Sequence, residues 1–285
     1  MMSFSNAWRE TAARRNSVLC AGLDPPVAEL GRGEKGLAAG ADRRRWALEY
    51  LEAVAPNCAA IKPNVQYWKG PGDIEIVEEV CAAARDLGLL VIEDAKLADI
   101  GATNDAGFFY AARRADAVTF APFAGNVPEA VEQAHGRGIG IIVLCLMSNP
   151  EYGREKSKLI AGGDDPQYRL IAAEARAADA DAVVVGAPSP SNHITEEELA
   201  TVRSTIGRDL VVLMPGVGAQ GGEAGPVWRV FEEDQVIVNA GRALMFPDGS
   251  DSTPQQQAAA ARKLNESLNR DRTRDGRGER RGRSR

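Results

Sequence analysis

The chain has 285 residues and a formal net charge of −6, and 44% of its residues are hydrophobic, enough for a sizeable core in one large or two small domains. Residues 270–285 hold eight arginines against three acidic residues, so the rest of the chain carries −11, which argues against nucleic-acid binding as the main function. No apolar run reaches the about 18 residues that span a bilayer, and the N-terminus lacks the apolar core of a signal peptide. We therefore expect a cytoplasmic protein without a membrane segment.

The cysteines and histidines give no sign of a metal centre. The four cysteines stand singly in or near apolar segments, without a CxxC pair, which is typical of buried, reduced thiols. The two histidines, His135 and His193, are too few for a histidine-rich site. We expect neither a metal nor another cofactor.

In chain order, an extra helix is expected at 4–15, ahead of the first strand, where it would cap the N-terminal face of the sheet. Short apolar runs then alternate with helical patterns eight times. The predicted strands lie at 17–23, 58–62, 89–93, 116–120, 139–145, 181–186, 209–214 and 235–239. The helices between and after them are predicted at 42–55, 72–87, 103–114, 126–137, 165–178, 195–206, 223–233 and 254–268.

This alternation predicts an α/β protein with a parallel sheet, and eight units in roughly 250 residues fit a (β/α)8 TIM barrel. A doubly wound open sheet is the alternative, but it more often has fewer strands. We expect a single domain over 1–268 and an Arg-rich, disordered tail over 269–285, because no apolar residue follows Leu268. The tail could touch RNA or acidic surfaces, although a dispensable solvated tail is the favoured interpretation.

The segment VIEDAKLADIGATN at 91–104 places three charges just after a buried strand. Asp94 and Lys96 are two residues apart, so on an extended strand they point to the same side, and Asp99 follows. A solvated loop with a surface salt bridge would give the same pattern. In a barrel, however, the C-terminal strand ends build the active site.

Polar side chains follow most of the other strands as well. Each could be a solvated loop residue, but their joint placement at one mouth is hard to assign to chance. These residues are Asp24, Lys62, Ser148, Gln220 and Arg242.

The last two strands are followed by glycine-rich loops, PGVGAQGG at 215–222 and the end of VNAGR at 238–242. Glycines let backbone amides approach an anion closely, and Arg242 adds a forked cationic donor. A plain turn would also explain the glycines. Barrels commonly bind phosphate between these two loops, so a phosphorylated metabolite is the expected substrate.

Together these segments resemble the orotidine 5'-phosphate decarboxylase family, in its longer bacterial and archaeal type. The resemblance covers nearly everything from Val18 to Phe246, whereas the stretch 31–41 and the tail lie outside it. It rests on AGLDP (21–25), IKPN (61–64), EDAKLADIGATN (93–104), APF (121–123), MS (147–148), PGVGAQGG (215–222) and NAGR (239–242).

The resemblance implies decarboxylation of orotidine 5'-phosphate to uridine 5'-phosphate, in pyrimidine biosynthesis, by a homodimer without a cofactor. It implies a catalytic tetrad of Lys62, Asp94, Lys96 and Asp99, with Asp99 supplied by the partner subunit. Lys96 is then the proton donor to C6 of the pyrimidine after carbon dioxide leaves.

The resemblance also implies how the substrate is bound. Asp24 and Lys62 hold ribose hydroxyls together with Thr103 from the partner subunit, and Ser148 reads the pyrimidine ring. The phosphate is bound by Gln220 and Arg242, in the two loops that also place Pro215 and Gly241 at the substrate.

Two other functions are considered. Related sugar-phosphate enzymes, such as 3-keto-gulonate-6-phosphate decarboxylase and hexulose-phosphate synthase, use magnesium held partly by a carboxylate where this chain has Lys62. A charged lysine cannot ligate magnesium, which argues against them. A non-catalytic phosphate-binding barrel is the second alternative, and loss of Lys96 or of an aspartate would have pointed to it.

Overall fold

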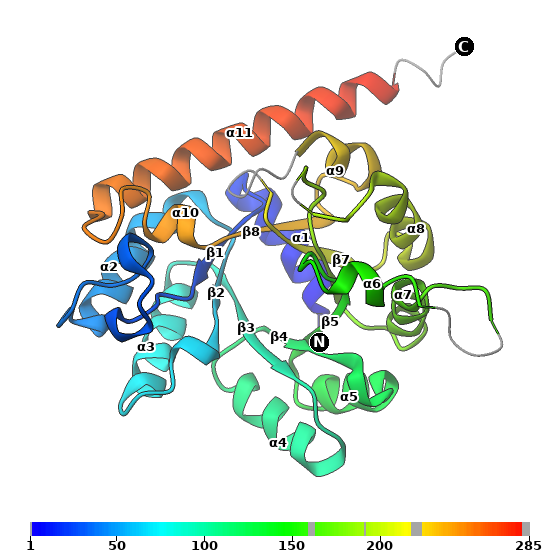
Figure 1. Ribbon diagram of the computed structural model, residues 1–285, viewed down its shortest axis with the longest axis horizontal. Coiled ribbons are helices and arrows are strands. Elements are labelled where there is room, and N and C mark those ends of the chain that lie inside the picture. The colour runs from blue at the N-terminus through cyan, green and yellow to red at the C-terminus, as the bar shows by residue number, and fades with distance from the viewer. Residues whose placement is uncertain (1, 159–162, 191, 218–223, 281–285) are drawn as a thin grey trace.

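The structure is a computed structural model that describes residues 2–158, 163–190, 192–217 and 224–280. Within these residues, parallel strands close into a barrel in the order β1 to β8, and helices surround it (Figure 1). The (β/α)8 TIM barrel predicted from the sequence is thereby confirmed. The strands are β1 Leu19–Leu23, β2 Ala60–Pro63, β3 Leu90–Leu97, β4 Ala117–Phe120, β5 Gly140–Leu146, β6 Ala182–Val185, β7 Val211–Pro215 and β8 Val236–Ala240.

The longer helices follow the predicted alternation. They are α1 Phe4–Arg15, α2 Arg43–Val54, α3 Asp73–Asp86, α4 Gly101–Ala112, α5 Val127–Gly136, α7 Gln167–Ala177, α8 Glu196–Ile206, α9 Ala224–Val230 and α11 Pro254–Arg280. Two short helices, α6 Tyr152–Glu155 and α10 Arg242–Met245, lie in loops. Single 3₁₀ turns form η1 Ala28–Leu30, η2 Gly33–Lys35, η3 Ala55–Asn57, η4 Val65–Tyr67 and η5 Pro122–Ala124.

Most strand residues are apolar because both faces of the sheet are covered, and the charged residues of β2 and β3 lie near the C-terminal strand ends. All residues of β1, β4 and β6 are buried, with side chains filling the barrel on one side and packing under helices on the other. Local signals set the helix starts. For example, α8 begins with a capping box between Thr195 and Glu198.

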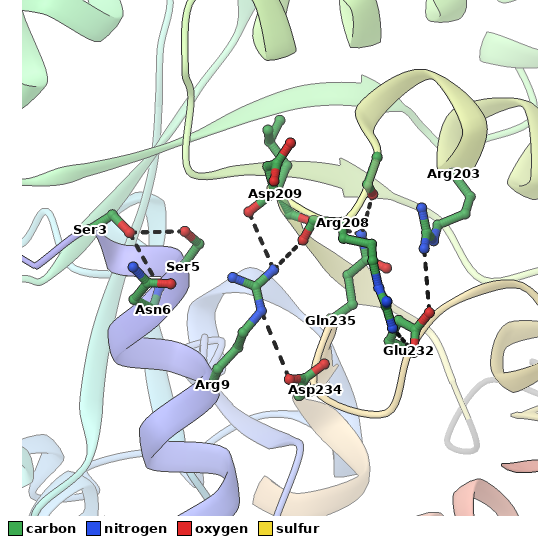
Figure 2. Close-up of polar contacts among 12 residues, drawn as sticks. Ser3, Ser5, Asn6, Arg9, Arg203, Arg208, Asp209, Glu232, Asp234 and Gln235 are labelled. Atoms are coloured by element: carbon green, nitrogen blue, oxygen red, sulfur yellow. Dashed lines mark hydrogen bonds and ion pairs between the residues drawn. The ribbon is translucent and has the colours of Figure 1, made fainter.

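Helix α1 lies across the N-terminal end of the barrel, as predicted. Phe4 and Trp8 are buried there, and the Phe4 N–H donates to Asp181 Oδ1, just before β6, at 2.8 Å. Figure 2 shows Arg9 reaching the Asp209 carbonyl, just before β7, at 3.3 Å, and Asp234 before β8. This helix closes the end of the barrel opposite the predicted site.

Helix α11 differs from its prediction, because it runs beyond 268 to Arg280 (Figure 1). Asn269 donates to the Asn16 carbonyl at 2.9 Å, and Arg272 donates to Asn16 Oδ1 at 2.7 Å. Polar contacts from Asn269 and Arg272 to Asn16, the residue that ends α1, therefore accompany the continuation of α11 beyond Leu268. The disordered tail expected over 269–285 stays a prediction. Residues 281–285 lie outside the described residues.

No helix in the described part of the chain is both long and apolar enough to cross a membrane.

Candidate active site

A cavity of about 550 Å³ opens at the C-terminal ends of the barrel strands. Its walls combine a polar side with an apolar side. The polar lining residues are Asp24, Lys35, Lys62, Asn64, Asp94, Lys96, Thr119, Asn239 and Arg242. The remaining lining residues are Leu144, Met147, Val184, Leu213, Pro215, Gly216, Ala240, Gly241, Ala243 and Phe246.

Asp94 lies between two ammonium groups in this cavity. Its Oδ2 accepts a hydrogen bond from Lys62 Nζ, and its Oδ1 accepts one from Lys96 Nζ. The side chains of Lys62 and Asp94 are 9% and 10% exposed, whereas that of Lys96 is 42% exposed. Lys96 is therefore the member of this network that is open to a ligand.

The electrostatics of the network keep the buried pair ionised. Burial acts to raise the pKa of Asp94, but the charges and hydrogen bonds of Lys62 and Lys96 outweigh it and lower that pKa to about 2. Burial acts to lower the pKa of Lys62, but the charge and hydrogen bond of Asp94 outweigh it and raise that pKa. A carboxylate and an ammonium thus remain fixed at the base of the cavity.

Lys96 reaches the network through a distortion of β3. The strand was expected to end at 93, but it continues to Leu97 after a register shift between Glu93 and Leu97 against β4. Lys96 sits in this bulge with a φ of 51°, in the left-handed region that non-glycine residues rarely adopt. Its N–H donates to Thr119 Oγ1 at 2.9 Å, which holds the bulge in place.

Asp24, after β1, lies beside the loop that follows β8. Burial, the largest effect, raises the pKa of Asp24, although the charge of Lys62 acts against it. Its Oδ1 is buried without a hydrogen-bond partner in the described part of the chain. A Cβ on Gly241 would lie 2.8 Å from this oxygen, so the close approach of the two loops requires glycine. This oxygen can accept a hydrogen bond from a hydroxyl group of a ligand.

Of the two residues expected to bind the phosphate, the structure places Arg242 at the cavity. Arg242 begins α10, directly after Gly241, and lines the cavity together with Pro215 at the end of β7. Gln220 lies outside the described residues, so its placement stays a prediction.

Three predicted residues do not line the cavity. Asp99 and Thr103 are exposed at the start of α4, where the Asp99 N–H donates to Asn104 Oδ1 at 3.1 Å. Ser148 is half-buried after β5, and its neighbour Met147 lines the cavity in its place. The structure therefore brings Asp24, Lys62, Asp94, Lys96 and Arg242 together around one cavity, whereas Asp99 and Thr103 are exposed and do not line it.

Several lining residues were not predicted from the sequence. Thr119 stands in the run AVTF, where a threonine is an ordinary strand former and gives no separate signal. Asn64 is part of the segment IKPN and Asn239 part of NAGR, so both could have been named from their strand ends. Lys35 comes from the stretch 31–41, which contains none of the motifs that pointed to a site.

In the described part of the chain, no group of three or more histidine, cysteine, aspartate or glutamate side chains could hold a metal ion. The carboxylate of Asp94 is paired with two ammonium groups instead.

A closed (β/α)8 barrel with alternating ammonium and carboxylate groups at its strand ends, and an arginine at the rim, is the architecture of an enzyme acting on an anionic small molecule. The chain belongs to the orotidine 5'-phosphate decarboxylase / HUMPS family, which it matches over residues 17–258.

The similar proteins match this chain over nearly its whole length and over nearly the whole of their own. The orotidine 5'-phosphate decarboxylase of Deinococcus radiodurans is 33% identical over 94% of this chain and 97% of its own length. That of Halorubrum lacusprofundi is 32% identical over 94% and 99%. Among solved structures, the OMP decarboxylase of Leishmania donovani has a TM-score of 0.75 at 26% identity, covering 95% of this chain and 99% of its own. The orotidine 5'-monophosphate decarboxylase of Methanocaldococcus jannaschii, complexed with the inhibitor BMP, has a TM-score of 0.64 at 25% identity, covering 88% and 98%.

Proposed function

We propose that this protein decarboxylates orotidine 5'-phosphate to uridine 5'-phosphate in pyrimidine biosynthesis, without a cofactor, and that Lys96 protonates C6 of the pyrimidine. The observation that carries the proposal is the Lys62–Asp94–Lys96 network at the base of a cavity whose rim holds Arg242. The cavity volume of about 550 Å³ lies within the roughly 300–1,000 Å³ of small-molecule sites.

The charges suit the chemistry of this decarboxylation. Loss of carbon dioxide leaves a carbanion at C6 that the ring cannot delocalise, so it must be stabilised by fixed charges. Lys96 is the exposed ammonium of the network and donates a hydrogen bond to Asp94. It can face the developing negative charge and then deliver a proton to C6.

Asp94 contributes in the ground state as well. A substrate carboxylate about 4 Å from Asp94 would be repelled by about 4 kcal/mol at an effective dielectric of 20. Departure of carbon dioxide removes that repulsion. Stabilisation of the carbanion by Lys96 carries more of the proposed catalysis, because it acts only as charge develops.

We propose further that the active protein is a cytoplasmic homodimer, in which Asp99 and Thr103 complete the site of the partner subunit. The start of α4 carries both residues and is exposed. Exposed apolar side chains occur at Ile100, further along α4 and in η5, and exposed apolar side chains of this kind are a feature of protein interfaces. They are Ile100, 61% exposed, Phe109, 43%, Tyr110, 57%, and Phe123, 92%.

The magnesium-dependent sugar-phosphate enzymes of the same family are a weaker candidate. Their reaction needs a carboxylate on the metal where this chain has Lys62, and the Lys62 ammonium is instead bound to Asp94.

A spectrophotometric assay with orotidine 5'-phosphate tests the proposal. We expect turnover that is unchanged by a chelator and reduced by orders of magnitude in Lys96→Ala. Turnover of orotidine 5'-phosphate that is abolished by a chelator and restored by magnesium would contradict the proposal that no cofactor is needed. No turnover together with tight binding of uridine 5'-phosphate would indicate a non-catalytic binding barrel.

A further inference from the structure

The stretch 31–41, which contains none of the sequence motifs that carry the family resemblance, is fastened to the mouth of the cavity. The Leu37 N–H donates to the Pro26 carbonyl at 2.8 Å, and Leu37 is 5% exposed. This hydrogen bond ties the stretch to the segment that follows β1. Ser250, in the segment after β8, donates to the Gly33 carbonyl at 3.1 Å. The turn η2, which ends at Lys35, is thus held over the β1 and β8 ends of the barrel.

Four cationic side chains in the described part of the chain line the cavity, and two of them remain available to bind an anionic ligand. Lys62 and Lys96 are both committed to Asp94. Arg242 and Lys35 line the same cavity, and among the side chains that the structure describes neither forms an ion pair. A substrate phosphate carries close to two negative charges at neutral pH, so one arginine alone leaves part of its charge uncompensated.

Lys35 and Arg242 also come from neighbouring parts of the barrel. Strand β1 pairs directly with β8, with Ala21 opposite Ala240. Lys35 follows β1 and Arg242 follows β8, so both cations belong to the same side of the mouth. Lysine serves phosphate as a compact point charge on a flexible stem, which complements the planar fork of arginine.

We propose that Lys35 is a second cation for the 5'-phosphate of the substrate, supplied by the 31–41 loop. This inference rests on the proposed decarboxylase function and adds a specificity residue to it. The loop then contributes to recognition of the remote phosphate, whose binding energy supports catalysis at C6.

The test compares Lys35→Ala with Arg32→Ala, a matched loss of charge in the same loop at an exposed residue that does not line the cavity. Catalytic efficiency with orotidine 5'-phosphate and inhibition by uridine 5'-phosphate and by uridine are measured at low ionic strength. Lys35→Ala should lower kcat/KM and weaken inhibition by uridine 5'-phosphate by roughly tenfold. Inhibition by uridine, which has no phosphate, should stay within about twofold. Lys35→Arg should restore most of the loss, and Arg32→Ala should behave as the wild type.

Two results would overturn the inference while the wild type remains active. One is an unchanged kcat/KM in Lys35→Ala. The other is an equal loss toward uridine and uridine 5'-phosphate, which would mean that Lys35 only orders the loop. Absence of turnover in the wild type would instead contradict the proposed function.

Discussion

Lys96 is held at both its backbone and its ammonium group. Its left-handed conformation costs on the order of 1–3 kcal/mol, so neighbouring groups must fix it. The hydroxyl of Thr119 accepts the Lys96 N–H at 2.9 Å and donates to Asp94 Oδ1 at 3.2 Å. Thr119 therefore ties the backbone of the proposed proton donor to the carboxylate that binds its ammonium, and we infer that it is a positioning residue.

Replacing Thr119 with valine keeps the shape of the side chain and removes the hydroxyl. The Lys96 N–H then loses its partner in a largely buried place, a loss of roughly 1–3 kcal/mol. We expect kcat to fall about tenfold or more, with KM little changed, because Lys96 acts mainly after the substrate is bound. Steady-state kinetics with orotidine 5'-phosphate measure the effect.

Thr119→Ser is the control for this prediction, because serine keeps the hydroxyl and should recover most of the activity. If the serine and valine variants lose kcat equally, the hydroxyl has no positioning role. An equal rise of KM in both would point to a change in cavity shape instead.

At this scale the sequence predicts charged groups better than the contacts that arrange them. Lys62, Asp94 and Lys96 were predicted because they follow strand ends that share one mouth of the barrel and match the tetrad that the family resemblance implies. The bulge at Lys96 could not be predicted, because it depends on the register with β4 and on a hydrogen bond to Thr119. Lys35 could not be predicted either, because only the fold brings its loop to the cavity.

His135, in the last turn of helix α5, is a titratable residue at the end of the barrel opposite the proposed site. His135 Nε2 lies 2.9 Å from Asp181 Oδ2, and this hydrogen bond, opposed by burial, raises the pKa of His135 above 6.5. Asp181 also accepts the Phe4 and Ile141 N–H groups, so it joins α1, α5 and two strands.

His135 should therefore make stability depend on pH. Its folded-state pKa is raised, so its contribution is complete below about pH 6.5 and is lost as pH rises through the folded-state pKa. Urea denaturation measures the difference in unfolding free energy between the wild type and His135→Gln. This difference should be larger below about pH 6.5 than at a pH above the folded-state pKa of His135. A difference that does not vary with pH would show that the contact contributes no proton linkage.

Helix α11 illustrates why element boundaries are harder to predict than elements. The helix was predicted to end at 268 with its last apolar residue, because apolar periodicity was the signal. The structure continues it through hydrogen bonds from Asn269 and Arg272 to Asn16, more than 250 residues away in sequence. Contacts between chain ends leave no local pattern.

We expect removal of residues 270–285 to leave catalysis intact. Leu268 and Ala261, which are 1% and 0% exposed, remain to dock α11, and the described part of the removed segment does not line the cavity. Loss of the Arg272 bond at the exposed end should lower Tm only slightly. The measurement is kcat/KM together with thermal unfolding of the truncated chain. A large fall in activity or in dimer stability would show that the segment is structural.

At the scale of the whole molecule, one chain supplies only part of the proposed tetrad. Lys62, Asp94 and Lys96 meet in one cavity, whereas Asp99 is exposed and does not line it. A two-fold interface through this face is reciprocal, so it would bury the same apolar side chains twice and create two equivalent shared sites. The fold of the single chain was predictable from its periodicity, but its assembly depends on a surface that periodicity does not describe.

Subunit exchange between two nearly inactive variants, Lys96→Ala and Asp99→Ala, tests the shared site. In a mixed dimer one site collects both defects, while the other recovers native Lys96 and native Asp99. Random assortment of equal amounts then restores roughly a quarter of all sites, so activity should rise to about a quarter of the wild-type value. If both residues served the site of their own chain, every site would keep one defect and mixing would restore nothing. Activity that stays at the level of the separate variants, with exchange verified by mass spectrometry of differently tagged subunits, would reject the shared site.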